Sequence, residues 1–261
     1  MGILNVTPDS FSDGGRYLDP ERALEHALAM ETAGADIIDV GGESSRPGDA
    51  REVSPLEEVA RVRPVLRRLS GKLRVPISID TRRAEVARVA LDAGAAIIND
   101  ISALADPQMA PLAAKAGCAV VLMHMRGGLA DHIKFARYNN LVEEVVRFLR
   151  ERSRHAIAAG IAPARIVVDP GIGFAKTTSH NLELIRDLPR ISALGYPVLI
   201  GASRKTFVRK IAGESPEAIR LANVAIDALA IANGASIIRV HEPGPARAAV
   251  AMAAAVTRAT I

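Results

Sequence analysis

The chain has 261 residues, of which 49% are hydrophobic, and a formal net charge of +4. This composition can fill a sizeable core, and an aromatic content of only 3% favours a parallel sheet covered by helices over an aromatic-rich β-sandwich. The basic residues are scattered, and no apolar run approaches the roughly 20 residues of a membrane span. We therefore expect neither a nucleic acid nor a membrane partner.

The single cysteine, Cys118, allows no internal disulfide and fits a reducing cytoplasm. It precedes an apolar run, so we expect a buried small side chain and not a nucleophile. The densest basic stretch, residues 61–74, alternates with apolar residues and predicts a solvated face of an amphipathic helix.

Short apolar, β-branched runs recur along the chain and predict strands, at residues 2–6, 35–42, 75–80, 95–101, 119–125, 165–171, 197–203 and 236–242. Helical patterns separate them. Asp19-Pro20 opens the first and Gly34 closes it, while Ser54 and Glu57 form the pattern of a capping box. The glycines just before later strands, Gly94, Gly117, Gly160, Gly195 and Gly234, stand where helices end.

Eight strand–helix units in about 250 residues predict an α/β fold, a TIM (β/α)8 barrel that forms a single domain over residues 1–261. A doubly wound open sheet is the alternative. It usually needs fewer strands and a glycine-rich first turn, and neither GxGxxG nor GxxxxGK[ST] occurs in the chain.

Polar residues follow the apolar runs at their carboxyl ends: Asn5, Asp39 to Arg46, Asp80, Asn99-Asp100, His124, Asp169, Ser203 to Lys205, and Arg239 with His241. A TIM barrel places its active site at that face. Each of the acidic residues alone could cap a helix. Stability does not favour collecting all of them beside a core, because burying an unpaired carboxylate costs several kcal/mol.

The chemistry of these side chains indicates a polar ring and an anion. Asp80, Asn99 and Asp169 would suit a flat heterocycle with an amidine-like donor edge. Arg239 and His241 suit a phosphate or diphosphate, and Lys205 adds positive charge. No CxxC pair or HExxH motif is present, yet a hard cation held by Asn5 and substrate phosphates would leave little trace in a sequence.

At these residues the chain closely resembles the dihydropteroate synthase family. The motifs GILNVTPDSFSDGG, GGESSRPG, SIDT, NDI, DPGIGF, GASRK and RVH match in order over essentially the whole chain. The resemblance implies a transferase that joins 6-hydroxymethyl-7,8-dihydropterin diphosphate to p-aminobenzoate and releases diphosphate. It also implies Mg²⁺ as cofactor, a homodimer, and sulfonamides as inhibitors.

The resemblance assigns roles by position. It implies that Asn5 ligates Mg²⁺ and, with Arg239 and His241, holds the diphosphate. The pterin would meet Asp80, Asn99, Asp169 and Lys205. The p-aminobenzoate pocket would be formed by Phe11, Ser45, Arg46, Pro47 and Ser203. The implied catalytic residues are Lys205, Arg239, His241 and Asp13, acting in a displacement that resembles an SN1 reaction.

The chain departs from the family pattern at a few positions. Ser45 replaces a common Thr, Thr206 replaces a Ser, and Ala175 stands where Gly is frequent. Ala175 matters only if its backbone needs a positive φ, where a Cβ costs about 1 kcal/mol or more. We also expect the loop that starts at Asn5 to close over substrates with Gly14-Gly15 as hinge, which would place Phe11 beside the arylamine.

Two other functions are compatible with a pterin-binding barrel. One is the pterin domain of a cobalamin-type methyltransferase, which would have no need of the DSFSDGG, SRK and RVH motifs. The other is a non-catalytic paralogue that binds pterin, for which damage at Lys205 or Arg239 would be the sign. The sequence carries no such damage.

Overall fold

The structure, a computed structural model, describes residues 1–7, 19–44 and 53–259. The strands lie at the centre and are β1 (Gly2–Asn5), β2 (Ile38–Gly41), β3 (Ile77–Asp80), β4 (Ile97–Asp100), β5 (Ala119–Met123), β6 (Ile166–Asp169), β7 (Leu199–Ile200) and β8 (Ile237–Ile238). They are parallel, pair in chain order from β1 to β6, and pair again between β7 and β8. Single bridges from Val168 to Val198 and from Gly2 to Val240 close the ring. The predicted (β/α)8 barrel is confirmed, and the open-sheet alternative is wrong.

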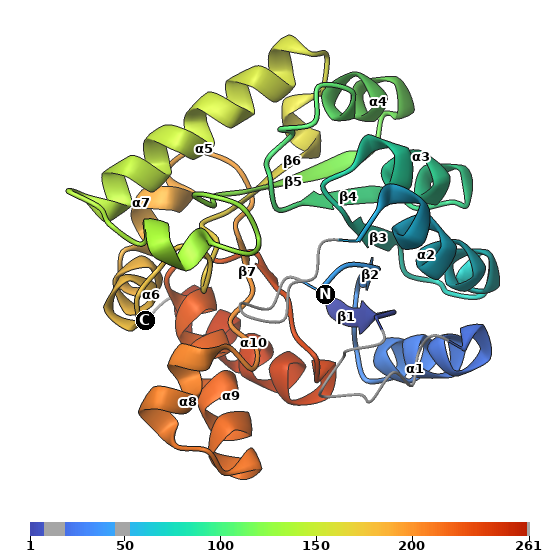
Figure 1. Ribbon diagram of the computed structural model, residues 1–261. Helices are drawn as coiled ribbons and strands as arrows, with labels where there is room; N and C mark the ends of the chain where they lie inside the picture. Colours follow the sequence, from blue (N-terminus) through green and yellow to red (C-terminus); the bar gives the residue numbers. More distant parts are fainter. Residues whose placement is uncertain (8–18, 45–52, 260–261) are drawn as a thin grey trace.

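The helices surround the strands (Figure 1). They are α1 (Pro20–Thr32), α2 (Pro55–Leu69), α3 (Ala84–Asp92), α4 (Met109–Ala116), α5 (Leu141–Ala158), α6 (Thr178–Arg186), α7 (Leu188–Ser192), α8 (Thr206–Ala212), α9 (Pro216–Ala232) and α10 (Pro243–Arg258), with 3₁₀ turns η1 (His132–Phe135) and η2 (Pro163–Arg165). Each strand lies inside its predicted apolar run but is shorter. The run residues beyond each strand supply the turns at the two ends of the barrel.

Helix termini follow the predicted signals closely. Asp19 accepts a hydrogen bond from the Glu21 amide and opens α1. Ser54 Oγ accepts from the Glu57 amide at 3.2 Å and opens α2. The Glu57 carboxylate binds Arg61 at 2.6 Å instead of returning to the cap, so only half of the predicted capping box forms. Every glycine predicted to end a helix has a positive φ, in the left-handed region that favours glycine.

The core comprises the strand side chains and the inner faces of the helices. Leu4, Ile38, Ile79 and Ile98 are fully buried, and the helices add small alanines and β-branched residues that let them approach the sheet. Cys118 is buried as a free thiol, as predicted. The helix predicted in residues 61–74 ends at Leu69, with Val62, Val65 and Leu66 facing inward.

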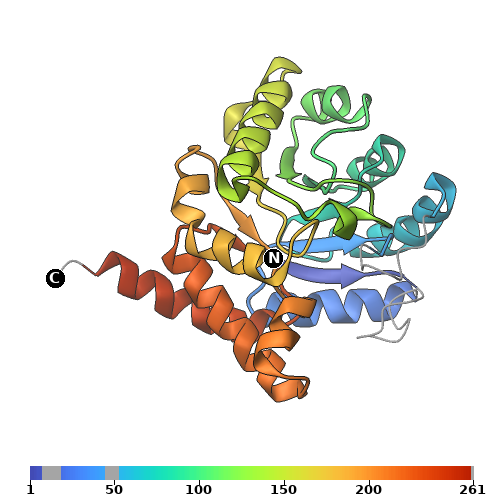
Figure 2. The same cartoon turned by 60° about the vertical axis from the view of Figure 1, so that its left-hand side comes forward.

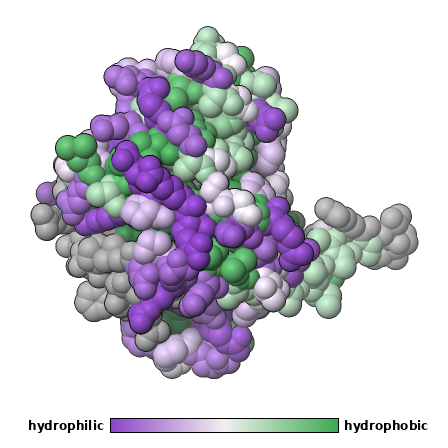
Figure 3. Space-filling model, turned by 90° about the vertical axis from the view of Figure 1, so that its right-hand side faces the viewer, coloured by the Kyte–Doolittle hydropathy of each residue, from purple (hydrophilic) through white to green (hydrophobic). Residues whose placement is uncertain are grey.

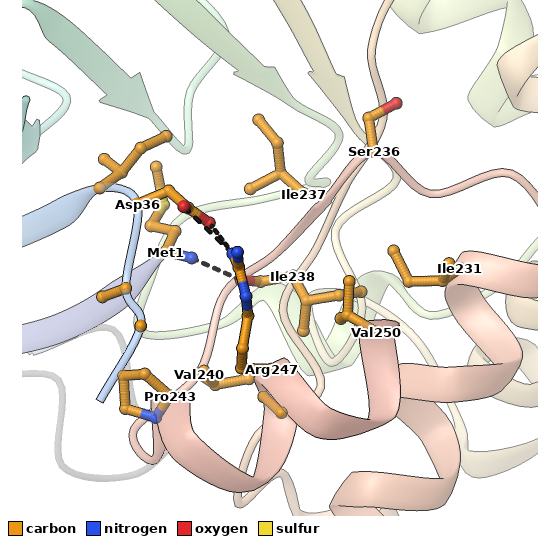
Figure 4. A pocket seen from close by; sticks show the side chains of 14 residues that line it. Met1, Asp36, Ile231, Ser236, Ile237, Ile238, Val240, Pro243, Arg247 and Val250 are labelled. Atoms are coloured by element: carbon orange, nitrogen blue, oxygen red, sulfur yellow. Dashed lines mark hydrogen bonds and ion pairs between the residues drawn. The ribbon is translucent and has the colours of Figure 1, made fainter. Parts of the chain in front are cut away.

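The two ends of the barrel differ in character. At the amino ends of β1, β2 and β8 lies a pocket between Met1, Ile237, Ile238 and α10, bordered by the Arg247–Asp36 ion pair at 2.9 Å (Figure 4). The carboxyl end of α10 extends away from the body of the molecule (Figure 2).

None of the helices within the described residues combines the length and hydropathy needed to cross a membrane.

Candidate active site

The carboxyl ends of four neighbouring strands bring three polar side chains to one level of the barrel. Asn5 on β1 is the lateral partner of Gly41, Gly41 is the partner of Asp80, and Asp80 is the partner of Asn99. A Cβ atom at Gly41 would lie 3.6 Å from Asn5 Oδ1 and 3.7 Å from Asp80 Oδ2. Because Gly41 has no side chain, the oxygens of Asn5 and Asp80 border the same small space.

Arg239 joins this row from the segment directly after β8, which lies next to β1 in the closed ring. Its Nε donates to Asp39 Oδ2 and its Nη2 donates to Asp80 Oδ2, each at 2.6 Å. Asn99 Nδ2 also donates to Asp39 Oδ2, at 3.0 Å. Asp39 is fully buried, and its Oδ1 has no hydrogen-bond partner among the described residues. One guanidinium therefore compensates two carboxylates that come from β2 and β3.

Arg239 is a fixed positive charge in the site, and two of the carboxyl groups there titrate near neutral pH. Burial raises the pKa of Asp80 to about 7, although the Arg239 guanidinium opposes the rise. Burial also raises the pKa of Asp169 to about 6, against the hydrogen bond that its Oδ1 accepts from the Gly171 amide at 2.7 Å. Burial acts against the charge of Arg239, but the two carboxylates outweigh burial and raise its pKa. Arg239 thus stays charged while both carboxyls can exchange protons.

Lys205 reaches the site from the start of α8. Its Nζ lies 4.2 Å from the centre of the Phe174 ring, in a cation–π contact. Ser203, two residues earlier, forms a hydrogen bond of 2.9 Å between its Oγ and Nδ1 of His241. The loops after β7 and β8 therefore fix each other and present Ser203, Lys205 and His241 at the same mouth.

Two polar residues at the strand ends have structural partners. Asp100 accepts hydrogen bonds from the amides of Ser102 and Leu104 and shapes the turn after β4. His124 is buried and packs edge-on against Phe148 at 4.9 Å, and its Nδ1 lies 3.0 Å from Lys176 Nζ. Burial, followed by the charge of Lys176, lowers the pKa of His124 to about 2, so the imidazole is neutral.

The structure brings together Asn5, Asp80, Asn99 and Arg239 as a contiguous group, with Asp169 at the end of β6, two strands beyond Asn99, and Ser203, Lys205 and His241 on the loops. Five predicted site residues lie outside the described residues: Phe11, Asp13, Ser45, Arg46 and Pro47. The hinge expected at Gly14-Gly15 lies outside them too.

Sequence reasoning missed the apolar wall of the site. Phe174 packs with Ile101 and Met123, and Met125 and Leu129 lie against this cluster. Phe174 is buried at 6% exposure, yet its ring supports Lys205. The available signals were its place in the DPGIGF motif, which begins at Asp169, and the presence of only five phenylalanines in the chain. Asp39 was noted as a carboxylate at a strand end, but its pairing with Arg239, 200 residues away, could not be read from spacing.

The oxygens around Gly41 are suited to a hard cation. Within the described part of the chain no cluster of three or more His, Cys, Asp or Glu side chains could hold a metal ion. Mg²⁺ keeps several waters and needs only one or two protein oxygens together with substrate phosphates. The Asn5 amide oxygen beside Asp80 fits that requirement, since both border the space left by Gly41.

Comparisons with known proteins agree on one family. The model of the family described as "Pterin binding enzyme" matches residues 1–241. The dihydropteroate synthase of Mycobacterium leprae is 48% identical over 250 residues, covering 93% of this chain and 87% of that protein. The dihydropteroate synthase of Yersinia pestis, solved as a sulfonamide drug complex, superposes with a TM-score of 0.95 at 42% identity, over 99% of this chain and 94% of that one.

The enzyme from Xanthomonas albilineans, solved with 4-aminobenzoic acid, is similar to the same extent. It superposes with a TM-score of 0.91 at 44% identity and covers 100% of this chain and 93% of that one. These likenesses extend over the barrel as a whole. They include the strand ends that carry Asn5, Asp39, Asp80 and Asn99, which together with Arg239 form the polar row.

Proposed function

Since this chain belongs to the pterin-binding enzyme family, as one of its dihydropteroate synthases, we propose that the polar row at the barrel mouth binds and activates the pterin substrate. The reaction joins 6-hydroxymethyl-7,8-dihydropterin diphosphate to p-aminobenzoate. The bond between the methylene carbon and the diphosphate oxygen breaks, a carbon–nitrogen bond forms, and the arylamine loses a proton. The observation that carries the proposal is the convergence of Asp39, Asp80 and Asn99 from three strands with Arg239 from the segment after β8.

The pterin ring is held by Asp80, Asn99, Asp169 and Lys205. Asp80 and Asp169 are buried acceptors whose raised pKa values reflect the cost of keeping a charge there. A heterocycle with an amidine-like donor edge would satisfy these oxygens through hydrogen bonds that bulk water does not disturb. Lys205, whose Nζ lies over the Phe174 ring, supplies a donor to the pterin.

The diphosphate is bound by Asn5, Arg239 and His241. Two donors of Arg239 already hold Asp39 and Asp80, which fixes the guanidinium plane before substrate arrives. His241 is oriented through the Ser203 contact to Nδ1. Mg²⁺, when bound at Asn5, would neutralise charge on the leaving diphosphate.

Carbon–oxygen cleavage precedes attack by the arylamine, as in an SN1 reaction. The electron-rich dihydropterin delocalises the methylene cation, and Asp80 and Asp169 favour positive charge on the ring they contact. Ser203 contributes to the p-aminobenzoate pocket, together with Phe11, Ser45, Arg46 and Pro47 of the loops outside the described residues. Asp13, on the first loop, is proposed to act near the reacting centre.

The direct test mixes purified protein with both substrates and Mg²⁺ and measures diphosphate and 7,8-dihydropteroate. A folded protein that makes neither product would contradict the assignment and favour the non-catalytic alternative. Lys205→Ala and Asp80→Ala are expected to lose most of the activity while circular dichroism shows a folded barrel. Lys210→Ala, which changes an exposed lysine on the same helix as a control, should leave turnover unchanged.

Magnesium binding is tested separately. Chelation should weaken diphosphate binding to the wild type, measured by calorimetry, and Asn5→Ala should remove most of this dependence. If diphosphate binds equally well with and without chelator, Asn5 is not a metal ligand.

We further propose that the protein is a homodimer in the cytoplasm. Leu221 and Leu229 on α9, and Met252 and Val256 on α10, are each more than half exposed. The projecting end of α10 is coloured as moderately hydrophobic in Figure 3. A pair of helices with four exposed large apolar side chains is the kind of surface that a second copy would cover. Leu229→Glu is expected to convert a dimer to a monomer in analytical ultracentrifugation.

A further inference from the structure

Ala175 adopts a backbone conformation that alanine disfavours. Its φ is +50°, in the left-handed region, and the residue is fully buried in the turn between β6 and α6. A Cβ crowds the following carbonyl oxygen in this region, so a non-glycine residue persists there only when its surroundings hold it.

Two side chains hold the Ala175 backbone from opposite ends. The amide N–H donates to His132 Nδ1 at 2.9 Å, and the carbonyl oxygen accepts from the Tyr138 hydroxyl at 3.0 Å. Both side chains come from the segment between β5 and α5, which is distant in sequence from the turn. The peptide group between Phe174 and Ala175 is held at its carbonyl as well, because Lys176 Nζ donates to the Phe174 oxygen at 2.9 Å.

The protonation states suit these hydrogen bonds. Burial raises the pKa of Tyr138 to about 12, so its hydroxyl keeps the proton that it donates. Burial, with the charges of Lys205 and Lys176, lowers the pKa of His132, so its Nδ1 remains an acceptor.

Histidine at position 132 buries a polar nitrogen, Nε2, at a cost in stability, which indicates that its other nitrogen has a role. The side chain is 1% exposed, and Nε2, which carries the proton when Nδ1 accepts, has no hydrogen-bond partner among the described residues. An apolar side chain of similar size would fill the space without burying an unpaired donor. What a histidine adds there is the acceptor for Ala175.

The turn that is held in this way positions Lys205. Phe174 immediately precedes Ala175, and its ring lies 5.5 Å from the His132 ring and 4.2 Å from Lys205 Nζ. A Cβ placed on Gly173 would approach Lys205 Cδ to 2.9 Å, so the turn and the lysine stem are in close contact. A change in the Ala175 backbone would therefore move the surface on which Lys205 rests.

We propose that His132 and Tyr138 are positioning residues, which hold Ala175 in its left-handed conformation and so place Phe174 beneath Lys205 for the transfer reaction. The proposal rests on the proposed role of Lys205 in binding the pterin. It extends the functional unit to a loop that makes none of the assigned substrate contacts.

The test is a double-mutant cycle with Ala175→Gly, because glycine adopts a positive φ without help. Tyr138→Phe and His132→Met should each lower kcat/KM for the dihydropterin diphosphate about tenfold in the wild-type background, the order expected from a left-handed alanine. In the Ala175→Gly background the same substitutions should lower it about twofold or less. Tyr196→Phe, which removes a hydroxyl outside this loop, is the control and should have no effect in either background.

The possible outcomes distinguish a failure of the proposed function from a failure of the positioning role. A wild type without synthase activity refutes the proposed function. An active wild type with equal losses in both backgrounds, or with no loss in either single variant, overturns the positioning role. Unfolding curves show the folded fraction for each variant, and Tyr138→Phe, which removes one oxygen atom, carries the cycle alone if His132→Met does not fold.

Discussion

Arg239 is the residue on which stability and function of the site depend together. It forms ion pairs with both Asp39 and Asp80, which come from β2 and β3. The Asp39 side chain is fully buried and that of Arg239 is 19% exposed, so water screens the pair poorly. Removing the guanidinium would leave two neighbouring carboxylates without compensation.

Arg239→Met is therefore expected to lower the free energy of unfolding by about 3–5 kcal/mol, the range for breaking a buried ion pair. The measurement is urea denaturation at neutral pH. Arg247→Met is the matched control, because Arg247 and its partner Asp36 are 57% and 76% exposed, and it should cost less than about 1 kcal/mol. Equal costs for the two variants would mean that Arg239 serves the substrate alone.

Asp80 and Asp169 should make pterin binding depend on pH. Their pKa values are raised to about 7 and about 6, so both become protonated as the pH falls through this range. The protonated forms lose acceptor oxygens, and we expect kcat/KM for the dihydropterin diphosphate to fall with them. The profile is measured from kcat/KM against pH, with circular dichroism as the control for folding. A flat profile between about pH 6 and 7 would place the pterin elsewhere.

In the turn after β6, the backbone conformation directly determines the position of a site residue, Lys205. Gly173 has a φ of +83° and Ala175 a φ of +50°, between Asp169 at the strand end and the start of α6. Two positive φ values within three residues fold the chain back sharply and bring Phe174 to Lys205. The backbone geometry of this turn therefore determines the position of the Lys205 ammonium group.

Gly173→Ala tests this arrangement. The Cβ would meet Lys205 Cδ, so we expect kcat/KM to fall about tenfold through displacement of the lysine. Gly195→Ala is the control, because its φ of +85° is nearly the same and nothing lies within 4 Å of its Cβ position. Both variants should lose about 1 kcal/mol of stability from the backbone conformation, and only Gly173→Ala should lose activity. Activity losses of equal size would contradict the contact with Lys205.

The elements could be predicted from the sequence because their signals are local. Strand runs, helix caps and left-handed glycines each depend on a few adjacent residues, and the polar residues at strand ends follow from barrel topology. The contacts of Phe174 with Lys205 and of His132 with Ala175 join different loops, so no local period encodes them. From the sequence, alanine at position 175 has a cost only if its backbone takes a positive φ, and the structure shows that it does. The roles on the first two loops remain predictions.

Across the whole molecule, the number of backbone pairings between neighbouring strands varies around the barrel. The strands β1 to β6 share continuous ladders, but β6 and β7 are joined by the bridge from Val168 to Val198, and β8 and β1 by the bridge from Gly2 to Val240. The strands β7 and β8 contribute two residues each. The two seams on either side of the β7–β8 pair are therefore the weakest parts of the wall.

Hydrogen exchange should reveal these seams. The amides of Val168 and Ile3, which donate across the seams to Pro197 and Val240, are expected to exchange faster than that of Val121 within the continuous ladder. The measurement is native-state exchange followed by mass spectrometry or NMR. Uniform protection around the barrel would show that it opens only as a whole.

Closure of the ring also fixes an order of events during synthesis. The Ile3 amide donates to the Val240 carbonyl, so β1 finds its second neighbour only after the segment around Val240 has left the ribosome. Until then β1 presents an open edge, and such edges invite pairing with other chains. Contacts between residues this far apart in the sequence are slow to form. A chaperone that shields the nascent β1 edge would therefore raise the yield of folded protein more than it would change the stability of the finished molecule.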